Sequence, residues 1–90
     1  MKTFVWDAEK NLKLQQERGI SFEQIIAAIE HGRLLDILEH LAKKYKDQKL
    51  YVVEIDQYVY IVPYHETEHE ILLMTVFPSR KFTKLYLTKE

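Results

Sequence analysis

The sequence predicts an α+β fold, in which a small antiparallel sheet carries two packed N-terminal helices and a short C-terminal helix. Three observations favour it. Two segments with helix start and stop signals come first, apolar segments rich in β-branched and aromatic residues follow, and helical spacing returns at the end. A chain of 90 residues is enough for one domain, so residues 1–90 are expected to fold as a unit.

The first elements are a short strand and a helix. Residues 4–6 are apolar, and Asp7 is a good N-cap for a helix over residues 8–18. The apolar face of this helix is thin and is formed mainly by Ala8 and Leu12, with Leu14 nearby. We therefore expect a surface helix with one shallow contact.

The second helix has the strongest start signal in the chain. Ser21 and Gln24 stand at the N-cap and N3 positions of a capping box. The i, i+3, i+4, i+7 pattern then holds for Phe22, Ile25, Ile26 and Ile29. Gly32 ends the helix. Residues 33–39 fit either a helical turn or a strand, and the glycine before them favours a new element, a strand.

Three further strands are predicted after a solvated loop at residues 40–48. The segments 49–55 and 58–64 are separated only by Asp56-Gln57 and should form a tight hairpin. The third strand, 71–78, is apolar on both faces. Such a strand needs cover on both sides, from the C-terminal segment or from a partner.

The C-terminal segment fits a short helix with two distinct faces. Phe82, Leu85 and Tyr86 share one face, while Lys81 and Lys84 share another. Residues 79–89 contain four basic and no acidic side chains, the one unopposed basic patch of the sequence. The net charge of −1 argues against broad electrostatic binding of nucleic acid, and leaves room for binding at this patch.

Composition excludes several classes of protein. The absence of cysteine removes disulfides, thiol nucleophiles and cysteine-ligated zinc, and suits a reducing cytosol. No run approaches 18 apolar residues, and the first residues lack a signal-peptide pattern. We therefore expect a cytoplasmic protein with no membrane association.

Residues 65–69 read His-Glu-Thr-Glu-His and match the H-E-x-x-H pattern of zinc peptidases. That pattern needs a helix to place both histidines on one face, and this segment lies between two strands. We interpret it as a charged hairpin loop, with zinc hydrolysis and adventitious metal binding as the alternatives. No metal and no cofactor are expected.

Two blocks of the sequence resemble the BrnT family of bacterial type II toxins. The first comprises Phe4-x-Trp6-Asp7, Lys10-Asn11 and the run from Arg18 to Glu23. The second comprises Ser79-Arg80-Lys81 with Thr83 and Lys84. The resemblance spans nearly the whole chain, and its first block is the more specific.

The resemblance implies a RelE-like fold and a metal-independent endoribonuclease that cleaves RNA and inhibits translation. It also implies a cognate antitoxin, usually with a ribbon-helix-helix DNA-binding domain, through which alone the complex would contact operator DNA. The alternative is a non-catalytic interaction protein of the same fold that binds a partner chain.

Metal-free RNA cleavage requires a base, an acid and cations that stabilise charge on phosphorus. Arg80 is the first candidate for holding the phosphate, because its planar guanidinium binds two oxygens. Lys81 is a second catalytic candidate, and Lys84 would help to bind the substrate. The alternative is that these cations solvate the terminal helix or pair with an acidic antitoxin.

His65 is the acid/base candidate, because histidine changes charge near neutral pH. It would lie at the end of a central strand, where the end of the last strand could come close. Tyr60 and Tyr64 share one face of that strand and are candidates for stacking on a base or donating a proton. The alternatives are an ordinary loop histidine and half-buried sheet tyrosines, and His31 and His40 are interpreted as surface residues.

Overall fold

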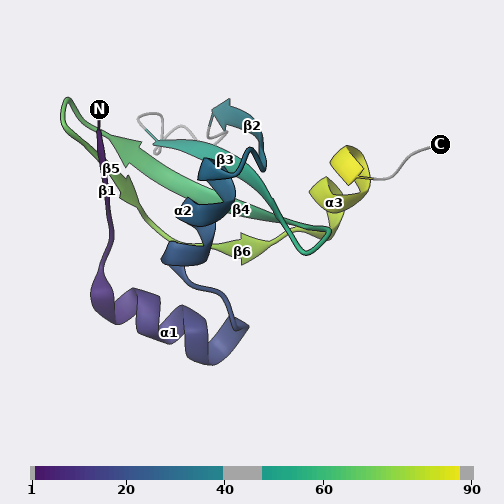
Figure 1. Ribbon diagram of the computed structural model, residues 1–90, viewed down its shortest axis with the longest axis horizontal. Helices are drawn as coiled ribbons and strands as arrows, with labels where there is room; N and C mark the ends of the chain where they lie inside the picture. The colour runs from purple at the N-terminus through teal and green to yellow at the C-terminus, as the bar shows by residue number, and fades with distance from the viewer. Residues whose placement is uncertain (1, 40–47, 88–90) are drawn as a thin grey trace.

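The computed structural model describes residues 2–39 and 48–87, which form three helices and six strands (Figure 1). The helices are α1 (Ala8–Arg18), α2 (Phe22–Glu30) and α3 (Arg80–Leu87). The strands are β1 (Thr3–Val5), β2 (Leu34–Glu39), β3 (Gln48–Ile55), β4 (Tyr58–Glu66), β5 (Glu70–Leu73) and β6 (Phe77–Pro78). The predicted α+β class is confirmed, and residues 34–39 form a strand. A loop was expected at residues 40–48; residues 40–47, and His40 with them, lie outside the described residues, and Gln48 is already the first residue of β3.

The sheet is mixed, whereas the sequence predicted an antiparallel one. Its strand order is β1-β5-β4-β3-β2, with β6 paired to β4. All pairs are antiparallel except β1 with β5, where Thr3 lies opposite Glu70. No tight turn joins β1 to a neighbouring strand, because two helices follow it, and the long connection permits a parallel pairing.

The predicted strand 71–78 is divided into β5 and β6, which pair with different parts of β4. Residues 74–76 separate them, and Val76 turns into the core, where its side chain is fully buried. The guanidinium of Arg18 donates to the Val76 carbonyl at 2.6 Å. A side chain therefore provides the hydrogen bond that a neighbouring strand would otherwise provide. An apolar run does not reveal such a break, because both halves of the segment are apolar.

The helix start and stop signals are confirmed. The Asp7 carboxylate accepts hydrogen bonds from the first turn of α1, and Gly19 adopts a left-handed conformation with φ of 66° after its end. Ser21 and Gln24 form both hydrogen bonds of the capping box on α2.

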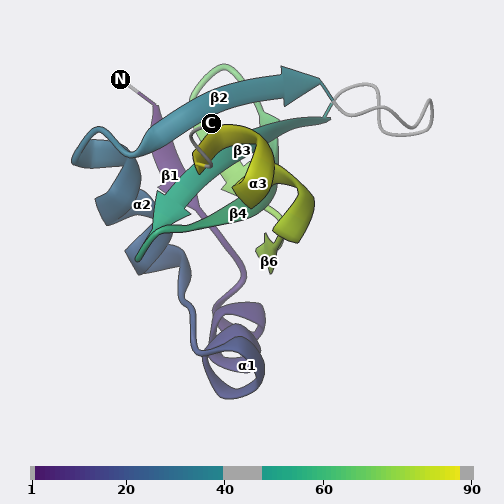
Figure 2. The same ribbon diagram turned by 90° about the vertical axis from the view of Figure 1, so that its right-hand side faces the viewer.

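The buried face of α1 differs from the expected one. Leu14 and Asn11 are buried, whereas Leu12 is 55% exposed and Ala8 is exposed. The amide of Asn11 donates to the Glu23 carboxylate at 2.7 Å, and its oxygen accepts the Phe22 N–H at 2.8 Å. A polar side chain therefore joins α1 to α2, and α1 lies beside the sheet in Figures 1 and 2.

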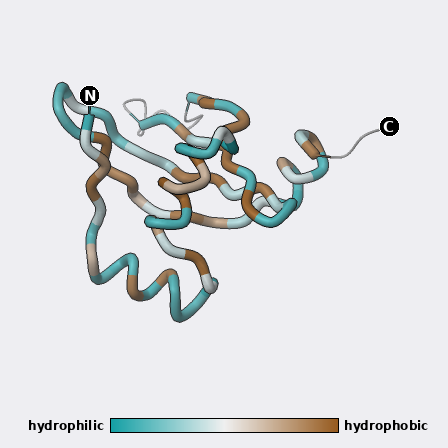
Figure 3. Tube along the Cα trace, in the orientation of Figure 1, coloured by the Kyte–Doolittle hydropathy of each residue, from teal (hydrophilic) through white to brown (hydrophobic). Residues whose placement is uncertain are grey.

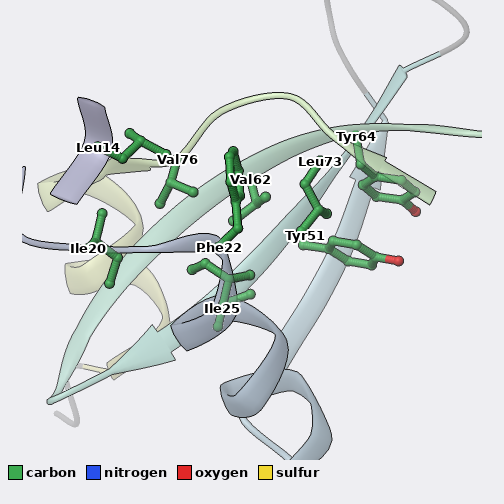
Figure 4. Close-up of a cluster of buried hydrophobic side chains, with 10 residues drawn as sticks. Leu14, Ile20, Phe22, Ile25, Tyr51, Val62, Tyr64, Leu73 and Val76 are labelled. Carbon is green, nitrogen blue, oxygen red and sulfur yellow. The ribbon is translucent and has the colours of Figure 1, made fainter. Parts of the chain in front are cut away.

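Two hydrophobic clusters lie on opposite faces of the sheet, because they contain alternate residues of β3 and β4. The first, partly drawn in Figure 4, packs α2 against Tyr51, Val53, Val62 and Tyr64. The second packs α3 against Val52, Val59 and Ile61. In Figure 3 the tip of the β3–β4 hairpin and the turn between β4 and β5 are hydrophilic. None of the described helices has the length and hydropathy needed to cross a membrane.

Candidate functional site

The helix α3 is fixed to the sheet at its N-terminal end by Ser79, Thr83 and Val59. The Ser79 N–H donates to the Val59 carbonyl at 2.9 Å, and the Val59 N–H donates to the Thr83 hydroxyl at 2.9 Å. That hydroxyl donates in turn to the Ser79 carbonyl at 2.7 Å. The Ser79 side chain also accepts the Phe82 N–H at 3.1 Å, so Ser79 is the N-cap.

A second attachment lies near the other end of α3. The Tyr86 hydroxyl donates to one carboxylate oxygen of Asp36 at 2.7 Å, and the other oxygen accepts the Ile37 N–H at 2.7 Å. This hydrogen bond raises the pKa of Tyr86, because an ionised phenol beside Asp36 would lose its donor role and face a like charge. Asp36 therefore links α3 to strand β2, which forms one edge of the sheet.

The three proposed cations of α3 lie on its exposed face. Arg80, Lys81 and Lys84 are all exposed, together with Leu85 at 65% exposure, while Phe82 and Tyr86 pack on the sheet. Among residues 2–39 and 48–87, no carboxylate lies within ion-pair distance of any of the three. Their charge is available to an anionic partner.

His65 does not lie near these cations. It is near the end of β4 that pairs with β5, whereas α3 begins beside Val59 near the start of the same strand. Six residues separate His65 from Val59, which corresponds to roughly 20 Å along a strand. The expectation that the last strand would bring Arg80 close to His65 is therefore wrong, because β6 pairs with Tyr60 and Ile61.

Tyr64 is not available for stacking on a base. Its ring is 3% exposed and stacks on the Tyr51 ring, with centroids 3.9 Å apart and planes at 11° (Figure 4). Burial, followed by the neighbouring Tyr51 and Glu66, raises the pKa of the Tyr64 hydroxyl, which keeps it neutral. Tyr60 is half-buried on the same face of the sheet, in edge contact with Tyr58.

The H-E-x-x-H segment is a hairpin, as interpreted. His65 and Glu66 end β4, and His69 lies in the turn before β5. Glu66 pairs with Lys2 at 2.5 Å, and this hydrogen bond lowers the pKa of the Glu66 carboxyl. Within the described ranges, no three histidine or acidic side chains are grouped so that they could hold a metal ion.

A groove of about 770 Å³ lies between the C-terminal end of α2 and the β3–β4 turn. Its lining includes His31, which was interpreted from the sequence as a surface residue, and Arg33, to which the sequence assigned no role. The signal that could have identified them is Gly32, because a glycine at a helix end fixes the direction of the residues on both sides.

The residues that carry the N-terminal resemblance have structural roles. Asp7 caps α1, Asn11 joins the two helices, Arg18 holds the β5–β6 connection, and Ser21 caps α2. In the second block, Ser79 and Thr83 anchor α3. These motif residues support the helices and their attachment, whereas Arg80, Lys81 and Lys84 of the second block are exposed.

Comparisons of the chain with protein families, curated proteins and solved structures find no match.

Proposed function

We propose that this chain is the toxin of a bacterial type II toxin-antitoxin system, a metal-independent endoribonuclease with a RelE-like fold that cleaves RNA and inhibits translation. The observation that supports it is the exposed cationic face of α3, formed by Arg80, Lys81 and Lys84 on an anchored helix. The BrnT-like pattern of the sequence supplies the class of protein.

The cations of α3 suit an RNA backbone for two reasons. Arg80 offers a planar fork that binds two phosphate oxygens, and Lys81 and Lys84 add positive potential along the same face. The whole chain carries a net charge of −1, so binding of RNA depends on local positive potential such as that of this face. The backbone of the helix is anchored through Thr83 and Tyr86, so no segment of chain has to be ordered when RNA binds.

The proposed partner is a cognate antitoxin in the cytoplasm, a ribbon-helix-helix protein through which alone the complex contacts operator DNA. The competing function is a non-catalytic interaction protein. It is favoured by the apolar side chains that remain exposed beside the cations, notably Leu85 at 65% and Phe77 at 37%. Both functions predict a bound partner chain, and only the toxin predicts RNA cleavage.

The test is expression of the chain alone in bacteria, beside a variant with Arg80→Gln, Lys81→Gln and Lys84→Gln. The matched control carries Lys10→Gln, Lys13→Gln and Lys49→Gln, which removes the same charge from other exposed positions. Growth arrest with RNA degradation is expected for the wild type and the control, and relief for the α3 variant. Absence of arrest with stable binding of a neighbouring gene product would favour the interaction protein.

Binding to single-stranded RNA gives a quantitative readout of the same face. Each phosphate contact contributes about 0.7 to the slope of log affinity against log salt for single strands. Loss of three contacts should therefore reduce the slope of the α3 variant by about 2. An equal slope for the α3 variant and the wild type would contradict RNA binding at this helix.

A further inference from the structure

The groove beside α2 holds histidine, arginine, carboxylate and amide side chains in one place. His31 follows the helix, Arg33 leads into β2, and the end of β3 and the following turn supply two carboxylates and an amide, from Glu54, Asp56 and Gln57. Helix α2 contributes Gln24 and two alanines to the lining, and the small alanine side chains leave space beside the polar groups. The groove contains none of the residues that the sequence assigned to a site.

A Schellman motif at the end of α2 positions His31 and Arg33. Gly32 has a φ of 79°, the left-handed conformation that glycine adopts without strain. The Arg33 N–H donates to the Ala28 carbonyl at 2.9 Å, and the Gly32 N–H donates to the Ile29 carbonyl at 3.2 Å. These two hydrogen bonds fix the backbone on both sides of the glycine.

The ring orientation of His31 leaves one nitrogen for chemistry. Its Nδ1 lies 2.7 Å from the Ala27 carbonyl oxygen. A carbonyl only accepts, so Nδ1 carries the hydrogen, and in the neutral ring Nε2 keeps its lone pair. His31 is exposed and lines the groove, so its ring can meet a ligand there.

Arg33 is held by Glu54 and keeps donors free for a ligand. One guanidinium nitrogen donates to the Glu54 carboxylate at 3.0 Å, and the side chain of Arg33 remains 56% exposed. The second oxygen of Glu54 accepts the Gln57 N–H at 3.2 Å. Since a guanidinium has five N–H donors, the ion pair leaves most of the fork available to a phosphate.

The turn that forms the other wall of the groove is strained. Asp56 and Gln57 both have positive φ, at 53° and 64°, where a two-residue hairpin normally has Asn-Gly or another glycine pair. A left-handed conformation costs roughly 1 kcal/mol for a residue such as glutamine. Positive φ at both central residues is the geometry of a type I′ turn, which joins β3 and β4 directly.

Resting on the proposed function, we infer that this groove is the cleavage site, with His31 as the general base and Arg33 as the phosphate ligand for a single-stranded RNA. Nε2 of His31 takes the proton of a ribose 2′-hydroxyl as that oxygen attacks phosphorus. The O2′–P bond forms, the P–O5′ bond breaks, and the leaving O5′ takes a proton from water. The products are a 2′,3′-cyclic phosphate and a 5′-hydroxyl end, and Glu54 is a positioning residue.

The location of the groove agrees with RNA binding at α3. Gln57 lines the groove, and Val59, two residues further on, receives the start of α3. Two strand residues span about 7 Å, against roughly 20 Å for the distance from Val59 to His65. Because α2 and α3 pack on opposite faces of the sheet, an RNA strand that contacts both the cations of α3 and the groove would have to pass around the tip of the hairpin.

The test compares cleavage of a synthetic RNA oligonucleotide by the full chain and by three variants. His31→Asn should lower kcat by about 10²–10⁴-fold with little change in RNA affinity, and Arg33→Gln by about 10²–10³-fold. His69→Asn, in the exposed β4–β5 turn, is the matched control and should keep wild-type activity. An oligonucleotide with one 2′-deoxyribose should resist cleavage at that position.

Three outcomes overturn the inference in different ways. Cleavage by His31→Asn at the wild-type rate refutes the groove and leaves the ribonuclease proposal intact. Absence of cleavage by the wild type refutes both. Cleavage of the deoxy-substituted position refutes attack by the 2′-hydroxyl.

A measurement on the wild type keeps the inference testable if a variant fails to fold. Uridine 3′-monophosphate is titrated into the protein while the histidine ring nitrogens are followed by NMR. The ring signals of His31 should shift and those of His69 should stay. A shift confined to other histidines would place the nucleotide outside the groove.

Discussion

Removal of a single hydroxyl from Tyr86 should loosen α3. In Tyr86→Phe the ring still packs on the sheet, and only the 2.7 Å hydrogen bond to Asp36 is lost. Hydrogen bonds to charged groups contribute about 1.5–3 kcal/mol when buried. Both partners are half-buried here, and Asp36 keeps the Ile37 N–H and access to water, so we expect a loss of about 1 kcal/mol.

Chemical denaturation and amide hydrogen exchange measure this loss. With a denaturant slope of about 1 kcal/mol/M, the urea midpoint should fall by about 1 M, and amides of α3 should exchange about 5-fold faster. Tyr58→Phe is the matched control, because its hydroxyl bonds to no described residue in the structure. Equal midpoints for the two variants would refute the role assigned to the link between Tyr86 and Asp36.

Three further changes test other parts of the structure. Asn11→Ala leaves the buried Phe22 N–H without its acceptor and should lower the free energy of unfolding by about 1–3 kcal/mol. Thermal unfolding measures this loss, and an unchanged melting temperature would contradict the link between the helices. Gln57→Gly relieves a left-handed residue and should raise stability by roughly 1 kcal/mol in urea, whereas a loss would show that the side chain supports the turn. Burial raises the pKa of Tyr51 and Tyr64, so the folded state holds these protons more firmly than the unfolded chain. The contribution of these two tyrosines to stability should be constant up to about pH 10 and be lost above it, and Tyr64→Phe should flatten that loss in urea titrations between pH 8 and 11.

Local signals in the sequence predicted the elements well, because the physical interactions that set them are local. The capping box of Ser21 and Gln24 needs only four consecutive residues, and the turn at Asp56-Gln57 needs only the two strands beside it. The same holds for Gly19 after α1. In each case the hydrogen bonds that decide the structure join residues close together in the chain.

Long-range contacts could not be predicted in this way. The parallel pairing of β1 with β5 and the register of β6 on β4 depend on segments far apart in the sequence. That register decides that Arg80 lies far from His65, and the expectation of a joint site failed for this reason. Similarly, the buried face of α1 rests on the polar residue Asn11, which hydrophobic periodicity does not detect.

The pairing of the first strand with β5 also has a consequence for synthesis on the ribosome. The strand partner of Thr3 is Glu70, which is synthesised 67 residues later. At 5–20 residues per second, that interval is about 3–13 seconds. Until then Leu14, Phe22 and Ile25, which pack with residues of later strands, have no completed core to enter. The nascent N-terminal third therefore exposes apolar surface during translation, and a chaperone or a partner made nearby has several seconds in which to reach it.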